Sequence, residues 1–175
     1  MTSFVRYSLR TLDVPAARAF YLDTLGLDIP SGPAAGPLEV WPLHERARAA
    51  GIPAHWLGQI HVDDPEAVRD AVVAAGGMAL GPLVDGPHGR YATVRDPWGA
   101  VFAASTATVP EGPSPVVWCH LHTRDPHAAR ALYGRLFGWG TEDGLSSAPG
   151  ADRMGSVSGL LPGAHPHWAF LFAVD

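Results

Sequence analysis

Lysine is absent from this chain of 175 residues, and all 12 of its basic residues are arginine. Because arginine does not form Schiff bases, lysine-dependent covalent chemistry is excluded. A positive surface is also missing, since 17 acidic residues give a formal net charge of −5 and the arginines form no run. Nucleic acids and anionic membrane surfaces require a concentrated positive face. The composition therefore favours a small-molecule ligand over nucleic acid or membrane.

Cysteine and long apolar runs are scarce as well. Cys119 is the single cysteine in the sequence, which excludes an internal disulfide and any paired-cysteine motif. No stretch approaches the roughly 20 apolar residues of a membrane helix. The N-terminal sequence MTSFVRYSLR lacks the apolar centre of a secretion signal. We therefore expect a cytoplasmic protein.

One sequence pattern occurs twice, 112 residues apart. The stretch DVPAARAFYLDTLG at 13–26 returns as DPHAARALYGRLFG at 125–138, and His55-Trp56 returns as His167-Trp168. A repeat at a fixed offset defines the architectural unit. We predict one complete unit at 1–108, a linker at 109–115, and an incomplete second unit at 116–175.

The incomplete unit predicts a partner. Its last strand, expected at 167–174, would lack the rest of its module and leave a sheet edge free to pair. Either the chain is a piece of a longer two-unit protein, or a second copy completes the unit. We expect a truncated chain that forms a homodimer.

Local patterns predict strands that alternate with short helices. In residues 4–10, Val5, Tyr7 and Leu9 alternate with polar residues, which indicates a half-buried strand. Asp followed by a nearby Pro predicts helix starts at residues 13, 64 and 125, and glycines close these helices. Further strands are predicted at 38–41, 56–62, 78–80, 90–95, 100–104 and 117–123, with a helical turn at 45–50.

Strand, Asp-capped helix and a small meander together make a βαβββ module. The first helix reads Asp-x-x-x-Ala-x-x-Phe-Tyr-x-x-x-Leu-Gly, and an Asp-Pro-x-Gly turn at 96–99 precedes a final strand. This combination resembles the vicinal oxygen chelate (VOC) superfamily of glyoxalase I, bleomycin-resistance proteins and extradiol dioxygenases. The resemblance implies an α+β fold of tandem βαβββ modules. It consists of one complete module pair, whose first module is shortened, plus an incomplete second pair, and each pair forms a cup for the ligand.

The resemblance also implies where metal ligands would stand, on the first strand of each module and on the strand after the Asp-Pro-x-Gly turn. Those positions hold Arg6, Leu57, Trp118 and Ala103. None of these side chains is a ligand for a divalent cation, which takes imidazole, carboxylate or thiolate donors. The resemblance then favours the metal-free branch, in which the cup is a binding pocket, and we predict no cofactor.

Two sets of side chains are expected on the cup faces. The first cup would present Arg6, Ser8, Arg10, Gln59 and His61. Paired guanidinium groups can clamp a carboxylate, phosphate or enolate, so we predict an anionic or acceptor-rich ligand, unless this face is simply solvated. His61 is the candidate general base, because histidine titrates near neutrality.

The second cup would present Trp118, His120 and His122, together with His167, Ala169 and Leu171. Trp118 is placed to stack on a planar ligand. His120 and His122 stand at the i, i+2 spacing that two metal ligands can use, so a divalent metal site there is the alternative to an aromatic pocket.

Two functions follow from these patterns. In the first, the protein binds a small planar or anionic molecule in a cup without a metal. In the second, it is a glyoxalase- or dioxygenase-type lyase, isomerase or oxygenase. Such an enzyme would use either a displaced metal site at His120 and His122 or metal-free acid–base chemistry through His61.

Overall fold

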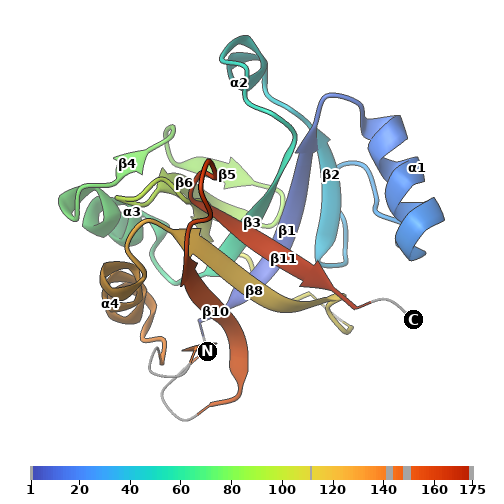
Figure 1. Ribbon diagram of the computed structural model, residues 1–175. Helices are drawn as coiled ribbons and strands as arrows, with labels where there is room; N and C mark the ends of the chain where they lie inside the picture. The colour runs from blue at the N-terminus through green and yellow to red at the C-terminus, as the bar shows by residue number, and fades with distance from the viewer. Residues whose placement is uncertain (1, 111, 141–143, 148–150, 174–175) are drawn as a thin grey trace.

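The computed structural model describes residues 2–110, 112–140, 144–147 and 151–173 (Figure 1). Its first unit contains β1 (Phe4–Thr11), α1 (Val14–Leu25), β2 (Leu38–Pro42), α2 (Glu45–Ala49), β3 (His55–His61), α3 (Pro65–Ala74), β4 (Met78–Ala79), β5 (Val84–Gly86), β6 (Gly89–Arg95) and β7 (Val101–Ser105). Its second unit contains β8 (Val116–Thr123), α4 (Pro126–Phe137), β9 (Leu145–Ser146), β10 (Arg153–Gly159) and β11 (His167–Phe172).

The described strands form two sheets. Seven strands make the first, in the order β2-β1-β3-β7-β6-β4 with β5 on β6, and four make the second, in the order β11-β8-β10-β9. β1 runs parallel to β2 and antiparallel to β3, and β8 has the same relation to β10 and β11. The second sheet therefore repeats part of the first. This is the predicted α+β fold, and its arrangement of strands is compatible with tandem βαβββ modules.

The helices begin and end where the sequence predicts. The Asp13 carboxylate accepts the N–H of Ala16 at 2.9 Å, and Asp125 accepts that of Ala128 at 2.9 Å. These bonds satisfy backbone donors that a helix start leaves free. Gly26 and Gly138 end α1 and α4 in the left-handed region, at φ 66° and 68°. Within the described residues, no helix is long and apolar enough to cross a membrane.

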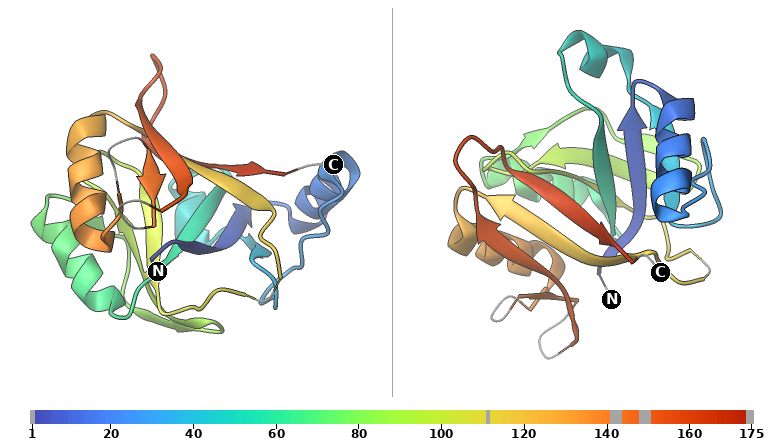
Figure 2. Two further views of the ribbon diagram at one scale, coloured as in Figure 1. Left: turned by 90° about the horizontal axis from the view of Figure 1, so that it is seen from below. Right: turned by 45° about the vertical axis from the view of Figure 1, so that its right-hand side comes forward.

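The two sheets pack through residues that the repeat relates to each other. Tyr7 and its counterpart Cys119 meet, with the hydroxyl 3.8 Å from the sulfur. Gly58 lies against its counterpart Phe170, so close that a Cβ on Gly58 would stand 2.6 Å from the ring. β1 and β3 thus lie against β8 and β11 (Figure 2).

This packing overturns the half-buried prediction for the first strand. The Tyr7 face of β1 is covered by the second sheet, while the opposite face carries Arg6 and Ser8, which are 7% and 0% exposed. Strand alternation reports only which side is apolar, and loops cover the polar side here. The sequence patterns also missed β5, β9 and β10, and at the end of β5 they assigned Gly86-Pro87 to a turn. Val174, at the end of the strand predicted for 167–174, lies outside the described residues.

Candidate functional site

The predicted first cup lies on the face of the large sheet that points away from the second sheet. Arg6 pairs in register with Gln59, and Ser8 pairs with Glu39 on the other side. Directly paired residues of neighbouring strands share a face. The polar residues predicted from β1 and β3 therefore do come together, and β2 adds Glu39 to them.

Glu39 forms the centre of this face. Its carboxylate is buried, with 2% of the residue exposed. Ser8 Oγ donates to Oε1 at 2.7 Å, and His88 Nε2 donates to Oε2 at 3.2 Å from the turn between β5 and β6. The sequence reasoning missed both residues. Glu39 stands on the last strand of a shortened module without an Asp-Pro-x-Gly turn to count from, and His88 sits in a turn.

Arg6 is engaged by the loop before β2. Its Nη1 donates to the carbonyls of Ala34 and Gly36 at 3.0 and 2.9 Å. Burial lowers the pKa of the Arg6 guanidinium, and the nearby Glu39 opposes that shift. Its Nε is buried and has no hydrogen-bond partner among the described residues. Arg6 thus fixes the loop 33–37 and keeps one donor unsatisfied.

Arg10 is placed differently from Arg6. Its guanidinium carbon lies 5.6 Å from the centre of the Trp41 ring, a cation–π contact, and makes no hydrogen bond to a described residue. Burial lowers the pKa of Arg10, while Tyr91 and Glu39 raise it. Trp41 Nε1 is itself buried and without an acceptor in the described part of the chain. The Trp41 donor therefore stays unsatisfied beside the Arg10 guanidinium, and a buried unsatisfied donor is costly unless a ligand or water accepts from it.

Gln59 and His61 complete the face from β3. Gln59 is 8% exposed and lies beside Ala103 of β7 in register. His61 is half-buried, and its Nδ1 lies 2.9 Å from the Ala107 carbonyl. Because a carbonyl only accepts, Nδ1 carries the proton and Nε2 is the basic nitrogen. In this tautomer, Nε2 of His61 makes no hydrogen bond to a described residue.

The second cup gathers the predicted aromatic and imidazole side chains on the outer face of the small sheet. The ring centres of His120 and His122 are 4.3 Å apart, and those of His122 and His167 are 4.8 Å apart. Two serines of β10 hold the cluster: Ser156 bonds Trp118 Nε1 and His120 Nδ1, and Ser158 bonds His120 Nε2.

The imidazoles of this cluster disfavour protonation. Burial, His122 and His167 lower the pKa of His120, and burial and His167 lower that of His122. A charge on one ring would repel a charge on its neighbours. Whichever tautomer His120 adopts, its lone pair already accepts from a serine hydroxyl. The cluster is therefore a neutral, hydroxyl-lined surface.

The facing strand positions of the two cups offer few donors for a divalent metal among the described residues. The pairs of facing positions in the first cup are Ser8 with Glu39 and Gln59 with Ala103, which supply one carboxylate and no imidazole. In the second cup the equivalent pair is His120 with Ser156. Among the described residues, no group of three or more His, Cys, Asp or Glu is arranged to hold a metal ion. A tightly held metal needs several such donors around one point.

Cys119 is buried in surroundings that disfavour its thiolate form. Burial raises the pKa of its thiol to about 12, a shift that the hydrogen bond with Tyr7 opposes. The nucleophilic form of cysteine is the thiolate, which requires a lowered pKa. Cys119 instead packs between the two sheets.

Comparison with curated proteins finds relatives across the chain. A protein of Mycobacterium bovis named as a candidate glyoxylase, CFP32, is 31% identical over 95% of this chain and 75% of its own length. The anthracycline biosynthesis protein DnrV of Streptomyces peucetius is 33% identical over 71% of this chain and 51% of its own. No family model matches the chain.

Solved structures share the fold at low identity. An extradiol ring-cleaving dioxygenase from B. fuscum matches 89% of this chain at a TM-score of 0.58 and 16% identity. The 2,3-dioxygenase LapB from Pseudomonas matches 96% of it at 0.57 and 14% identity. This chain spans 53% of the first of these two enzymes and 74% of the second.

Proposed function

This chain belongs to the vicinal oxygen chelate superfamily, and we propose that its first cup binds a small planar or anionic molecule without the help of a metal ion. The observation that carries the proposal is the pair formed by Arg10 and Trp41. A half-buried guanidinium and a buried indole N–H lie together without an acceptor from the described residues. A ligand oxygen could accept from both, and the indole face offers a surface for a ring.

Charge around the site limits the ligand. Glu39 is buried, and its carboxylate already accepts hydrogen bonds from Ser8 and His88. Arg10 and Trp41 are half-buried and form the accessible part. A compact oxyanion or a phenolic or quinone oxygen on a planar ring suits this arrangement. The name of the relative DnrV, an anthracycline biosynthesis protein, agrees with a planar aromatic ligand.

Calorimetric titration with 1-hydroxy-2-naphthoate, a planar carboxylate, tests the proposal. Arg10→Gln should weaken binding by at least about tenfold, since a hydrogen bond to a charged group is lost. Trp41→Phe, which removes only the N–H donor, should weaken it less. Arg48→Gln, an equal charge change on α2, should leave binding unchanged. Binding that disappears with a chelator, or that survives Arg10→Gln unaltered, would contradict metal-independent binding in this cup.

A second candidate function is metal-free acid–base catalysis of the glyoxalase or dioxygenase type. The favouring observation is the hydrogen-bonded pair of Glu39 and His88 on the face that also carries Arg10. A carboxylate and imidazole can exchange a proton with a substrate whose developing enolate the guanidinium stabilises. Glyoxalase and catechol-cleavage assays decide between the two functions. Turnover that is lost in Glu39→Gln while ligand binding persists would favour the enzyme.

The enzyme could also depend on a metal bound by His120 and His122, but fewer observations support this than support metal-free catalysis. Metal content of tag-free protein measures it directly. A near-stoichiometric metal that is lost in His120→Ala would support it, and it would overturn the metal-free proposal.

We also propose a homodimer. The support is that α1 leaves Phe20 and Leu22 58% and 50% exposed, and that β11 pairs on one side only among the described strands. Exposed apolar area and an unpaired strand edge both favour association. Light scattering after size exclusion measures the mass, and a monomer at all concentrations would contradict the dimer.

A further inference from the structure

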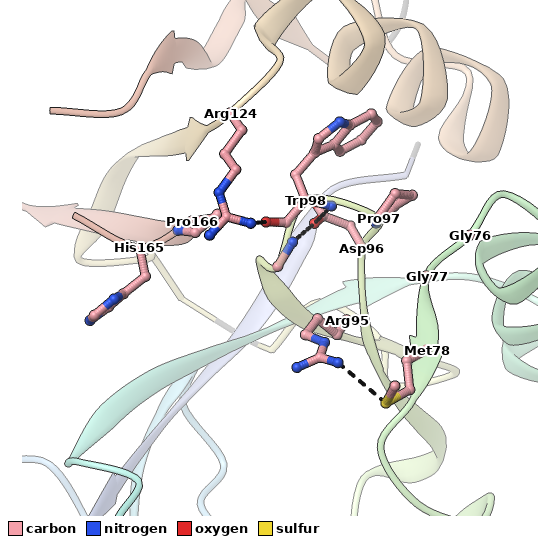
Figure 3. A pocket seen from close by; sticks show the side chains of 11 residues that line it. Gly76, Gly77, Met78, Arg95, Asp96, Pro97, Trp98, Arg124, His165 and Pro166 are labelled. Atoms are coloured by element: carbon pink, nitrogen blue, oxygen red, sulfur yellow. Dashed lines mark hydrogen bonds between the residues drawn. The ribbon is translucent and has the colours of Figure 1, made fainter. Parts of the chain in front are cut away.

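A cleft of about 430 Å³ lies at the junction of the two units, outside both cups (Figure 3). The first unit contributes the end of α3, the start of β4 and the turn between β6 and β7, and the second contributes Arg124 and the loop before β11. Its lining residues are Gly76, Gly77, Met78, Arg95, Asp96, Pro97, Trp98, Gly99, Arg124, His165 and Pro166. The volume is within the range of small-ligand sites, which begins at about 300 Å³.

The cleft is lined by cations that lack a carboxylate partner. Arg95 Nη2 reaches the sulfur of Met78 at 3.4 Å, and Arg124 Nη1 donates to the Trp98 carbonyl at 3.3 Å. A thioether is a weak acceptor, and a single carbonyl uses one of five guanidinium donors. Neither arginine forms an ion pair with a described residue. His165, from the loop before β11, adds a third nitrogen-bearing side chain.

The one carboxylate in the lining does not neutralise these cations. Asp96 is 2% exposed, and its Oδ1 accepts the N–H groups of Trp98, Gly99 and Ala100 at 2.7–3.0 Å. Its Oδ2 accepts the Tyr133 hydroxyl at 3.1 Å. Both oxygens are thus turned into the protein to hold the turn. Most of the Arg95 and Arg124 N–H donors therefore have no acceptor among the described residues and can bind a ligand in the cleft.

We propose that this cleft is a second ligand site, which binds a small oxyanion, either a carboxylate or a phosphate monoester, between Arg95 and Arg124. The two guanidinium groups offer planar sets of donors that match an oxyanion with two or more oxygens. In Figure 3 the two side chains come from different units, Arg124 beside Trp98 and Arg95 beside Met78. Pro97 and Pro166 supply apolar walls for the organic part of such a ligand.

Binding there would join the two units. Arg95 is the last residue of β6 in the first unit, whereas Arg124 lies between β8 and α4 of the second. A ligand that bonds both adds a contact to the interface and binds only the assembled state, so it raises the unfolding temperature as its concentration increases.

The test uses three probes, which are inorganic phosphate, phenyl phosphate and benzoate, with the intact chain. We expect phenyl phosphate or benzoate to raise the unfolding temperature, and calorimetry to show affinity at least about tenfold weaker in Arg124→Gln and in Arg95→Gln. Tighter binding of the phosphates than of benzoate identifies a phosphate site, and the reverse order identifies a carboxylate site.

Matched variants separate this site from general charge effects and from the first cup. Arg48→Gln changes the charge equally on α2, and Arg10→Gln disables the cup, so both should retain binding in the cleft. Both cleft arginines are exposed, so their variants are expected to fold normally, and the unfolding temperature without ligand checks this. No binding of any probe, or equal weakening by Arg48→Gln, would overturn the proposal.

Discussion

Helices α1 and α4 each start at an Asp N-cap and end at a glycine in the left-handed region, and a tyrosine of each helix accepts a hydrogen bond from a tryptophan. Only α4 is buried. Trp56 Nε1 donates to the Tyr21 hydroxyl at 2.8 Å, and Trp168 Nε1 donates to the Tyr133 hydroxyl at 3.3 Å. α1 has no buried residue among those described, whereas α4 buries Ala129, Leu132, Tyr133 and Phe137.

The difference comes from what lies beside each helix. Tyr133 also donates to Asp96 and packs its ring 5.6 Å from that of Phe102, both from the second module of the first unit. Tyr21 contacts the rings of Trp56 and Phe172 and stays half-buried. One local pattern therefore gives the same helix twice, while the neighbouring module decides whether the helix belongs to the core.

The largest expected effect comes from replacing the tyrosine of each helix, Tyr133 in α4 and Tyr21 in α1. Tyr133→Ala should lower the free energy of unfolding by about 3–5 kcal/mol, because it leaves a cavity and an unpaired Asp96 oxygen. Tyr21→Ala should cost about 1–2 kcal/mol, because the side chain is already half in water. Urea denaturation measures both. Equal losses at the two positions would show that α1 is covered in solution.

A second prediction concerns the crossing of the two sheets. Gly58→Ala would place a Cβ 2.5 Å from the Phe4 ring and 2.6 Å from the Phe170 ring. This overpacking should destabilise the fold by about 1–3 kcal/mol. Gly159→Ala is the control, because nothing lies within 4 Å of a Cβ there. A Gly58→Ala protein as stable as the control would contradict close packing at the crossing.

The third prediction concerns the N-caps of α1 and α4, which should contribute equally to stability. Asp13→Ala and Asp125→Ala each remove an N-cap bond and should each cost about 1 kcal/mol. Capping is local, so the burial of α4 should not alter the value. Thermal unfolding of the two variants gives the comparison, and a difference well beyond the error would show that the caps act through tertiary contacts.

The smallest expected effect is a dependence of stability on pH that comes from the second cup and not from the first. His120 and His122 occupy the places that Ser8 and Arg10 hold in the first cup, and their pKa values are lowered in the folded state. The unfolded chain then binds more protons as the pH falls below the ordinary value of 6.5, so stability declines from there downward. The double variant His120→Gln, His122→Gln should show a smaller decline in stability below pH 6.5. The unfolding temperature, measured as a function of pH, tests this. A decline that persists unchanged would assign it to other groups.

Much of the fold could be predicted from particular residues. Asp13, Asp64 and Asp125 begin helices as predicted, because a cap needs only its own next few backbone N–H groups. The repeat of His55-Trp56 at His167-Trp168 correctly predicted that β11 corresponds to β3. The alternation in β1 correctly placed Arg6 and Ser8 together on one face, opposite Tyr7.

The candidate site was harder to predict. Glu39 and His88 are 49 residues apart and meet only because β2 and the turn after β5 approach across the sheet. The two arginines predicted as a clamp behave differently, since Arg6 is held by the carbonyls of Ala34 and Gly36 while Arg10 lies over Trp41. Side-chain type does not reveal which loop will supply the competing acceptors.

The sequence by itself determined the helices, most of the strands, their repeat and the face on which β1 places its polar side chains, because caps, turns and alternation act over a few residues. Tertiary structure alone decided three further features. It buried α4 but not α1, paired Glu39 with His88, and brought Arg95 and Arg124 of different units to one cleft. Each depends on the approach of segments far apart in the chain, where packing and the competition for hydrogen-bond partners select among arrangements that the local sequence permits equally.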